Sequence, residues 1–192
     1  MMEANSRVPI GLYPRVLGDS WNNLDETVRH FHVQGRPVRA TGSFRIRHGN
    51  GRLAGWLLRL CGMPPAGAAV PTQLVVTPHG HGEQWVRTFG DQPLATTQCG
   101  RGRDLLVEHL GMLEFRFRLE VTDGVLIYRQ TGVALCLGPL SVPLPRCVAP
   151  HVVAREEPGG GANQTHVSVQ VLMPWVGLLI AYEGTVTSEE AP

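Results

Sequence analysis

The chain has 192 residues, 43% of them hydrophobic, and its 17 basic and 16 acidic residues give a formal net charge of +1. These values are typical of one globular domain with a substantial core, and the scattered charges exclude an electrostatic footprint for nucleic acid. All 17 basic residues are arginine, which excludes chemistry that needs a lysine, such as Schiff-base catalysis or a phosphate-loop lysine.

The sequence also predicts a protein without a membrane span, a metal site or a cofactor. Its longest apolar run, residues 171–182, is too short to cross a bilayer and is interrupted by Pro174. The N-terminus lacks the pattern of a signal peptide, so we expect a cytoplasmic protein. The four cysteines show no CxxC spacing, which favours free thiols over disulfides or a thiolate metal site.

The first part of the chain predicts a loose lead-in followed by a helix. Residues 1–17 contain two prolines and form the lead-in. Residues 18–33 predict a helix that Asp19 or Ser20 caps, because apolar side chains recur there at helical spacing. The apolar stripe consists of Trp21, Leu24, Val28 and Phe31.

A strand and a second short helix are expected next. Residues 38–51 predict a strand with Val38, Phe44 and Ile46 on one face and arginines on the other. Residues 52–62 predict a helix that ends at a glycine before two prolines. Its apolar face gathers Leu53, Trp56, Leu57 and Leu60. We expect this face to pack onto the sheet, with contact to a membrane surface as the alternative.

From about residue 70 onward the pattern changes to short alternating segments separated by Gly, Pro and Asp. The strongest local signal is the Asp123-Gly124 pair, which predicts a two-residue hairpin that places Leu119 opposite Tyr128. The expected strands lie near residues 71–78, 83–89, 93–99, 103–109, 112–122, 125–136, 151–157, 164–173 and 178–187.

These elements predict a mainly β protein of the β-rich α+β class. About nine or ten antiparallel strands cannot lie flat in one modest domain, so we expect a barrel or a tightly curled sheet with two short N-terminal helices. Residues 138–150 carry four prolines and are expected to form a crossover loop. Residues 1–192 are expected to form a single domain that ends in a loose tail at 188–192.

Polar residues on apolar strand faces are the candidates for a functional site. Alternation places Glu83, Trp85 and Arg87 on one face of their strand. If that face points inward, Arg87 either binds a carboxylate or phosphate of a ligand or forms a buried structural ion pair with Glu83. If it points outward, the charges form a solvated surface pair.

Alternation also places four other polar residues on core-facing sides, and a histidine lies beside the stripe of the first helix. A carboxylate buried among leucines must either pair with an arginine or carry a raised pKa. Arg87 is the expected partner. The additional candidates are Glu108, Tyr128, Glu156, Tyr182 and His32.

The order of several short motifs resembles a bacterial family known as domain of unknown function 4166. The matching stretches are Leu17 to Leu24, "RIRHG" at 45–49, "MPPAG" at 63–67, "EQWVRTFG" at 83–90, "VEHLGMLEFRFRLEV" at 107–121, "SVPLP" at 141–145, "ARE" at 154–156 and "MPWVGLLIAYEG" at 173–184. The resemblance implies a domain that occurs alone or behind a dehydrogenase-like nucleotide-binding domain, and hence a possible oxidoreductase partner. It implies no activity and no catalytic residues, and this chain has no GxGxxG motif of its own.

Three functions follow as hypotheses. The first is a barrel that binds a small apolar or amphipathic ligand in its interior. The second is an enzyme or an accessory domain of a reductase system, with Glu83, Glu108 or Glu156 as base and Arg87 orienting an acidic substrate. The third is a structural or protein-interaction domain without a ligand.

Overall fold

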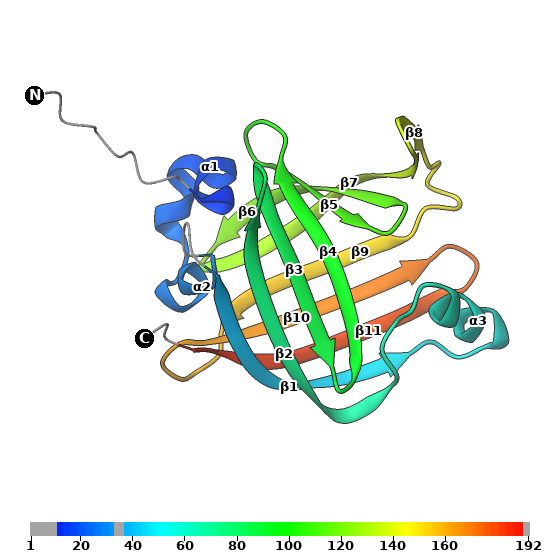
Figure 1. The fold of residues 1–192 in the computed structure, drawn as a ribbon, viewed down its shortest axis with the longest axis horizontal. Helices are drawn as coiled ribbons and strands as arrows, with labels where there is room; N and C mark the ends of the chain where they lie inside the picture. Colours follow the sequence, from blue (N-terminus) through cyan, green and yellow to red (C-terminus); the bar gives the residue numbers. More distant parts are fainter. Residues whose placement is uncertain (1–10, 33–36, 190–192) are drawn as a thin grey trace, which may run out of the picture.

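The computed structural model describes residues 11–32 and 37–189, which form a closed antiparallel β-barrel with helices at its ends (Figure 1). Ten strands follow one another around the barrel in the order β6-β5-β4-β3-β2-β1-β11-β10-β9-β7, and pairing of β6 with β7 closes it. The strands are β1 (Val38–His48), β2 (Gly67–His79), β3 (Gly82–Phe89), β4 (Gln92–Gly100), β5 (Leu105–Leu110), β6 (Leu113–Thr122), β7 (Val125–Leu137), β8 (Leu140–Pro143), β9 (His151–Pro158), β10 (Gln164–Met173) and β11 (Gly177–Glu189). The expected barrel is confirmed.

Side-chain alternation explains why these segments become barrel strands. In β1, Val38, Phe44 and Ile46 are buried whereas Arg45 and Arg47 are exposed, as expected for a strand with one face on a core. The Asp123-Gly124 hairpin has the predicted register, with Leu119 opposite Tyr128. Both turn residues have positive φ, which is the conformation that a two-residue hairpin turn of this type requires.

The proline-rich segment 138–150 is not entirely a loop. It contains the short strand β8, which pairs with the C-terminal part of β7 outside the closed ring of strands. The one proline of this strand, Pro143, is tolerated because β8 has only one strand neighbour.

The N-terminal prediction is wrong in two respects. The supposed lead-in contains the helix α1 (Leu12–Leu17), whose Leu12, Tyr13, Val16 and Leu17 are buried. The single helix over 18–33 is divided into a 3-10 helix η1 (Gly18–Asn23) and the helix α2 (Glu26–Phe31). Asp25 caps α2 instead of Asp19 or Ser20, because its carboxylate accepts the Thr27 backbone N–H at 2.9 Å. Val33 lies outside the described residues.

These N-terminal helices cover one end of the barrel, which we call the helical end (Figure 1). The Asp25 backbone N–H donates to the carbonyl of Gly124 in the β6–β7 turn at 3.0 Å. The Asp104 N–H, in the β4–β5 connection, donates to the carbonyl of Val16 at 2.8 Å. These bonds hold the helices across the strand turns, so their apolar side chains close the core there.

The prediction for the second helix is correct in position and wrong in orientation. The helix α3 (Arg52–Leu60) lies at the opposite end of the barrel, and it buries Ala54 and Leu58 (Figure 1). Leu53, Trp56 and Leu60 are exposed instead of packing onto the sheet. The first two residues of the expected tail at 188–192 belong to a strand, because β11 extends through Glu189; residues 190–192 lie outside the described part.

Candidate functional site

The barrel interior is not filled by side chains. A cavity of about 130 Å³ lies within it, bounded mostly by apolar residues from strands on all sides. On β10, the inward-facing Val167, Val169 and Val171 pack against the core on one side and border this space on another, and they remain partly exposed. The cavity therefore follows from the diameter of the barrel. A barrel of eight or more strands is wide enough to leave room for a small ligand.

Three aromatic rings form another part of the cavity wall. Phe44, Phe89 and Tyr182 have ring centroids 5.5–6.0 Å apart and meet edge to face. Gly184, beside Phe44 in the β1–β11 ladder, allows this arrangement, because a Cβ there would come within 2.8 Å of the Phe44 ring. The three rings make this part of the wall largely apolar.

The β3 face that carries Trp85 points into the barrel. Trp85 is only 4% exposed, and Arg87 beside it lines the cavity with 19% of its side chain exposed. The guanidinium carbon of Arg87 lies 5.0 Å from the centroid of the Trp85 ring, within the range of a cation–π contact. The charge is therefore inside the barrel, and the solvated-surface alternative for this strand is wrong.

Arg87 pairs with Glu108 and leaves Glu83 to another partner. Its Nη1 donates to Thr96 Oγ1 at 3.0 Å and lies 3.6 Å from Oε1 of Glu108. Burial opposes the charge on Arg87, but Glu108 together with Tyr182, Tyr13 and Tyr128 outweighs this effect, and the pKa of Arg87 lies above its usual value. The Glu83 carboxylate accepts the indole N–H of Trp85 at 3.1 Å. Burial raises the pKa of Glu83.

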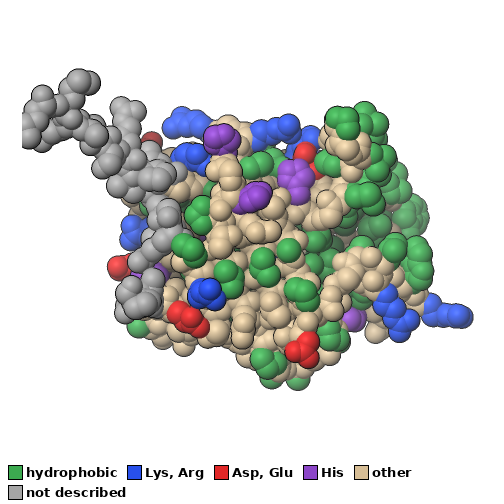
Figure 2. All heavy atoms as spheres, in the orientation of Figure 1, with side chains coloured by type: hydrophobic (Ala, Val, Ile, Leu, Met, Phe, Trp, Pro, Cys, Tyr) green, Lys and Arg blue, Asp and Glu red, His purple; other side chains and the backbone are tan. Residues whose placement is uncertain are grey.

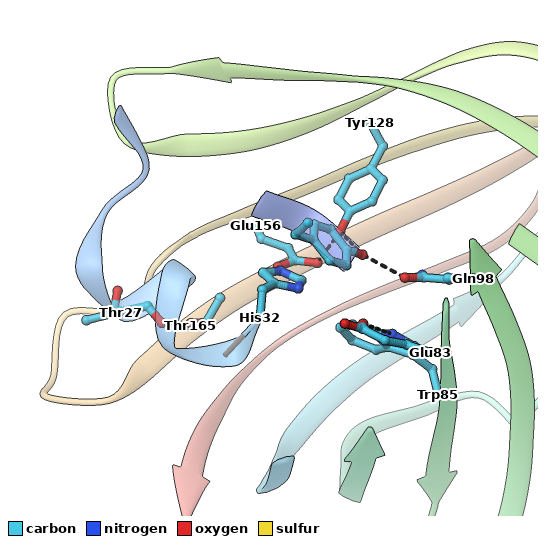
Figure 3. A network of polar contacts seen from close by, with 9 residues as sticks. Thr27, His32, Glu83, Trp85, Gln98, Tyr128, Glu156 and Thr165 are labelled. Atoms are coloured by element: carbon cyan, nitrogen blue, oxygen red, sulfur yellow. Dashed lines mark hydrogen bonds and ion pairs between the residues drawn. The ribbon is translucent and has the colours of Figure 1, made fainter. Parts of the chain in front are cut away.

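A chain of buried hydrogen bonds runs from the helical end to the cavity wall (Figure 3). The Tyr13 hydroxyl donates to Gln98 Oε1 at 2.8 Å and lies 3.0 Å from the Tyr128 hydroxyl. Tyr128 donates to Oε1 of Glu156 at 2.7 Å, and Oε2 of Glu156 lies 2.8 Å from Nε2 of His32. Five residues, from α1, the C-terminal end of α2 and three strands, thus form one connected network.

The network sets the protonation of its members. Burial, followed by the charge of Glu156, raises the pKa of Tyr13 and of Tyr128 well above the usual value. Burial alone would raise the pKa of Glu156, but the charge of His32 and hydrogen bonds from His32 and Tyr128 outweigh it and lower this pKa. The arrangement holds a charged carboxylate beside neutral hydroxyls.

His32 is the residue at which the network meets the helices. It is buried at the C-terminus of α2, and its ring stacks on that of Tyr13 with centroids 3.6 Å apart. Its Nδ1 atom is buried without a hydrogen-bond partner among the described residues. His32 therefore joins α1, α2 and β9 through one side chain.

Tyr182, one of the eight candidate residues, belongs to the aromatic wall, and the other seven also lie at or beside the cavity. Trp85, Arg87, Glu108, Tyr128 and Glu156 line it directly. Glu83 and His32 are one hydrogen bond further away, bonded to Trp85 and Glu156 respectively. The structure thus brings together residues from five elements, in two groups. One group is centred on Arg87 and the other on Glu156.

Sequence reasoning missed Tyr13, Gln98 and Thr96. Gln98 and Thr96 share the inward face of β4 with Leu94, so the same alternation that indicated Glu108 also contains their signal. Tyr13 lies in a six-residue helix, which is too short for a clear periodic pattern. No comparable pattern in the sequence therefore indicated Tyr13 as a site residue.

One polar cluster lies on the outer barrel wall, apart from the cavity. Oε1 of the buried Glu114 accepts from Nε of Arg116 at 2.6 Å, and Oε2 lies 3.4 Å from Nε2 of His109. With Cys136, these residues place three metal-ligand atoms within 4.8 Å of one another. Arg116 and Arg101 already bring positive charge to the carboxylate, so the cluster is organised as an ion-pair network.

The chain is similar to one protein family over most of its length. The model of a family described as domain of unknown function matches residues 24–186, which is most of the chain. The chain belongs to the domain of unknown function 4166 family. No curated protein and no solved structure matches it. In this DUF4166 domain the matched range contains the whole barrel except the last residues of β11, but it excludes Tyr13.

The family description names no ligand, reaction or partner, so association of this DUF4166 domain with an oxidoreductase stays a prediction. In residues 11–32 and 37–189, no helix has the length and apolar character needed to cross a membrane.

Proposed function

We propose that the DUF4166 barrel binds a small amphipathic molecule with an acidic group. The apolar part of the ligand lies against Val167, Val169 and the aromatic wall, and the acidic group faces Arg87. The observation that carries this proposal is the placement of a charged arginine on the wall of an otherwise largely apolar cavity. A few polar groups in an apolar concavity are the usual composition of a small-molecule site.

Arg87 has donors available for such a ligand. A guanidinium offers five N–H groups in a planar fork that matches a carboxylate or phosphate. Within residues 11–32 and 37–189 only one of them makes a hydrogen bond, to Thr96, and the Glu108 carboxylate is 3.6 Å away. A ligand carboxylate can therefore bind beside Glu108, and the stack on Trp85 orients the fork.

The probe for this proposal is a dansyl-labelled fatty acid, which becomes fluorescent in an apolar site. Lauric acid should displace it from the wild-type protein more strongly than dodecanol, because only the acid can pair with Arg87. Arg87→Gln should weaken lauric acid about ten-fold and leave dodecanol nearly unchanged. Arg118→Gln, on the outward face of β6, is the matched control and should change neither.

A second variant tests the cavity itself. Val169→Phe places a larger side chain in the cavity and should weaken the acid and the alcohol equally. Native mass spectrometry of the purified protein would show a retained ligand directly. The proposal is wrong if the wild-type protein binds neither probe, or if Arg87→Gln weakens the acid and the alcohol to the same extent.

Acid–base catalysis is a second candidate, which one observation favours. Glu156 lines the cavity and is bonded both to His32 and to Tyr128, so a proton acceptor is held beside two groups that can exchange protons. The test follows exchange of α-protons of small keto acids with deuterated water by NMR. Exchange that Glu156→Gln abolishes and Glu157→Gln preserves supports catalysis, and absence of exchange in the wild-type protein contradicts it.

A further inference from the structure

The exposed large hydrophobic side chains are concentrated at the end of the barrel opposite the helical end. Of the ten such side chains among the described residues, nine lie in α3, at residues 111–112, in 137–150 or at residues 174–176. The exception is Val153 on β9. We call these four segments the α3 rim. Figure 2 shows hydrophobic side chains along this end, with basic side chains projecting beside α3.

The helix α3 presents its large apolar side chains to solvent. Leu53, Trp56 and Leu60 are 56%, 59% and 68% exposed. They are three and four positions apart and therefore share one helix face. Ala54 and Leu58 are buried instead, so the helix packs through these two residues and leaves Trp56 and two leucines in solvent. Core packing does not account for this choice.

Trp175, in the β10–β11 turn, is also a large apolar side chain that is exposed to solvent. Its side chain is 91% exposed, and its backbone has a φ of 67°, which is rare for a bulky residue. The indole N–H donates to the carbonyl of Cys147 at 2.9 Å, which holds the ring against the neighbouring loop. The polar atom of the indole is thus satisfied while its apolar face remains in water.

The charge at the α3 rim has one sign. Arg52, Arg59 and Arg146 are exposed and have no ion-pair partner among the described residues, and neither α3 nor residues 137–150 contain an acidic residue. The acids near this end are Asp91, in the β3–β4 turn, and Glu114, at the start of β6, which is already paired with Arg116 and Arg101. Arg52 and Arg59 are four and three positions from Trp56, so they flank the apolar face of the helix.

We propose that the α3 rim docks this protein on the surface of a bilayer that contains anionic lipid. Trp56, Trp175 and the leucines of α3 enter the boundary between headgroups and acyl chains, where amphipathic aromatic rings are favoured. The arginines remain among the anionic headgroups. A second copy of the chain fits less well, because a symmetric contact would bring unpaired arginines together.

The docked orientation would direct the barrel interior toward the lipid. Met63, which follows α3, and Leu110, which ends β5, lie at this end and line the cavity. Docking nevertheless does not depend on the proposed ligand, since the rim residues are outside the barrel. Vesicle binding and cavity binding are therefore tested separately, and either can fail alone.

The test is flotation of the full chain with vesicles of phosphatidylcholine, with or without phosphatidylglycerol. The wild-type protein should bind the anionic vesicles more strongly, and added salt should weaken this binding. The double variant Arg52→Gln/Arg59→Gln should lose roughly five-fold per arginine. Trp56→Ser/Trp175→Ser should lose about ten-fold or more, because both rings leave the interface. Val153→Ser, an exposed apolar residue on β9, is the matched control and should bind as the wild type does.

A second measurement does not depend on the stability of any variant. Bromine-labelled lipid should quench tryptophan fluorescence in the wild-type protein, since two of its four tryptophans lie at the rim. Absence of flotation and quenching with anionic vesicles would overturn the proposal. It would also be overturned if Trp56→Ser/Trp175→Ser bound as well as Val153→Ser, or if light scattering showed dimers that the tryptophan variant alone dissociates.

Discussion

Nε2 of His32 lies 2.8 Å from Oε2 of Glu156, and this buried contact joins the end of α2 to the barrel strand β9. The two residues are 124 positions apart in the chain. Because Glu156 also accepts from Tyr128, one carboxylate connects the helical end to the cavity wall. The polar network therefore both connects the N-terminal helices to the barrel and forms part of the wall of the candidate site.

Glu156→Gln should release the helices from the barrel. The Glu156 carboxylate is hydrogen-bonded to both Tyr128 and His32 inside the protein, and its loss is expected to cost about 3 kcal/mol of unfolding free energy. Hydrogen exchange of residues 11–32 should accelerate more than exchange of the β3–β4 hairpin. Glu157→Gln alters an exposed pair with Arg155 and is the control. Equal acceleration in both variants would show that the tie is not local.

The barrel could be predicted from the alternation of apolar and polar side chains, because this alternation is a local property of each strand. It located every strand of the closed ring within a few residues, and the Asp-Gly turn set the register that pairs Leu119 with Tyr128. It also placed Trp85 and Arg87 on one face. Which of the carboxylates Arg87 meets was not predictable, since that depends on how β3, β4 and β5 stagger.

Two features of the structure depend on how distant parts of the chain are arranged in space, which no local sequence pattern indicates. The apolar stripe of α3 predicted burial of Trp56, but the helix lies at the rim and buries Ala54 instead. The cavity likewise depends on the barrel diameter, which is a property of the number and tilt of all strands. Tyr13 was missed because a six-residue helix barely exceeds one turn of periodicity.

The tyrosines should ionise only when the protein unfolds. The chain has three, and burial raises the pKa of Tyr13, Tyr128 and Tyr182. Because the folded state holds these protons more tightly, their contribution to stability is complete below the unfolded pKa of about 10 and is lost as pH rises through the folded values. Tyrosinate absorbance and circular dichroism should therefore change together in an alkaline titration. Absorbance that rises while the far-ultraviolet spectrum stays native would contradict this.

Tyr13→Phe isolates the contribution of one hydroxyl. The substitution removes the donor to the buried Gln98 Oε1 and one of the two buried partners of Tyr128, which keeps its bond to Glu156, so we expect a loss of about 1–3 kcal/mol in urea unfolding. Tyr182→Phe is the matched control, since among the described residues the Tyr182 hydroxyl makes no hydrogen bond and its ring also lines the cavity. A loss as large in Tyr182→Phe would indicate that ring packing, not the hydroxyl, is responsible.

Gly184→Ala should destabilise the barrel where β1 meets β11. The added Cβ would collide with the carbonyl oxygen of Ser43 and come within 2.8 Å of the Phe44 ring. Overpacking of this kind costs about 1–3 kcal/mol. Gly132→Ala on β7 is the control, because a Cβ there meets no atom within 4 Å. Thermal unfolding of the two variants compares them directly, and a lowered midpoint in Gly132→Ala alone would contradict the prediction.

Glu114 should account for part of the acid sensitivity of the protein. Burial by itself would raise the pKa of Glu114, but the hydrogen bond from Arg116, with Arg116 and Arg101 as positive charges, outweighs it and lowers this pKa. A carboxyl whose folded pKa is depressed contributes stability above its unfolded pKa, and that stability is lost as pH falls through the folded value. Its contribution should therefore be complete at neutral pH and decline below about pH 4.5.

Glu114→Gln tests this sign directly in urea unfolding at several pH values. At neutral pH the variant should be less stable than the wild type by about 1–2 kcal/mol, because the Arg116 bond loses its charge. The difference should shrink on acidification, since the wild-type carboxyl then also becomes neutral. Glu120→Gln, which alters the exposed pair with Arg129, should change stability by about 0.5 kcal/mol or less at every pH. A Glu114→Gln deficit that stays constant from neutral to acidic pH would show that its cause is packing rather than charge.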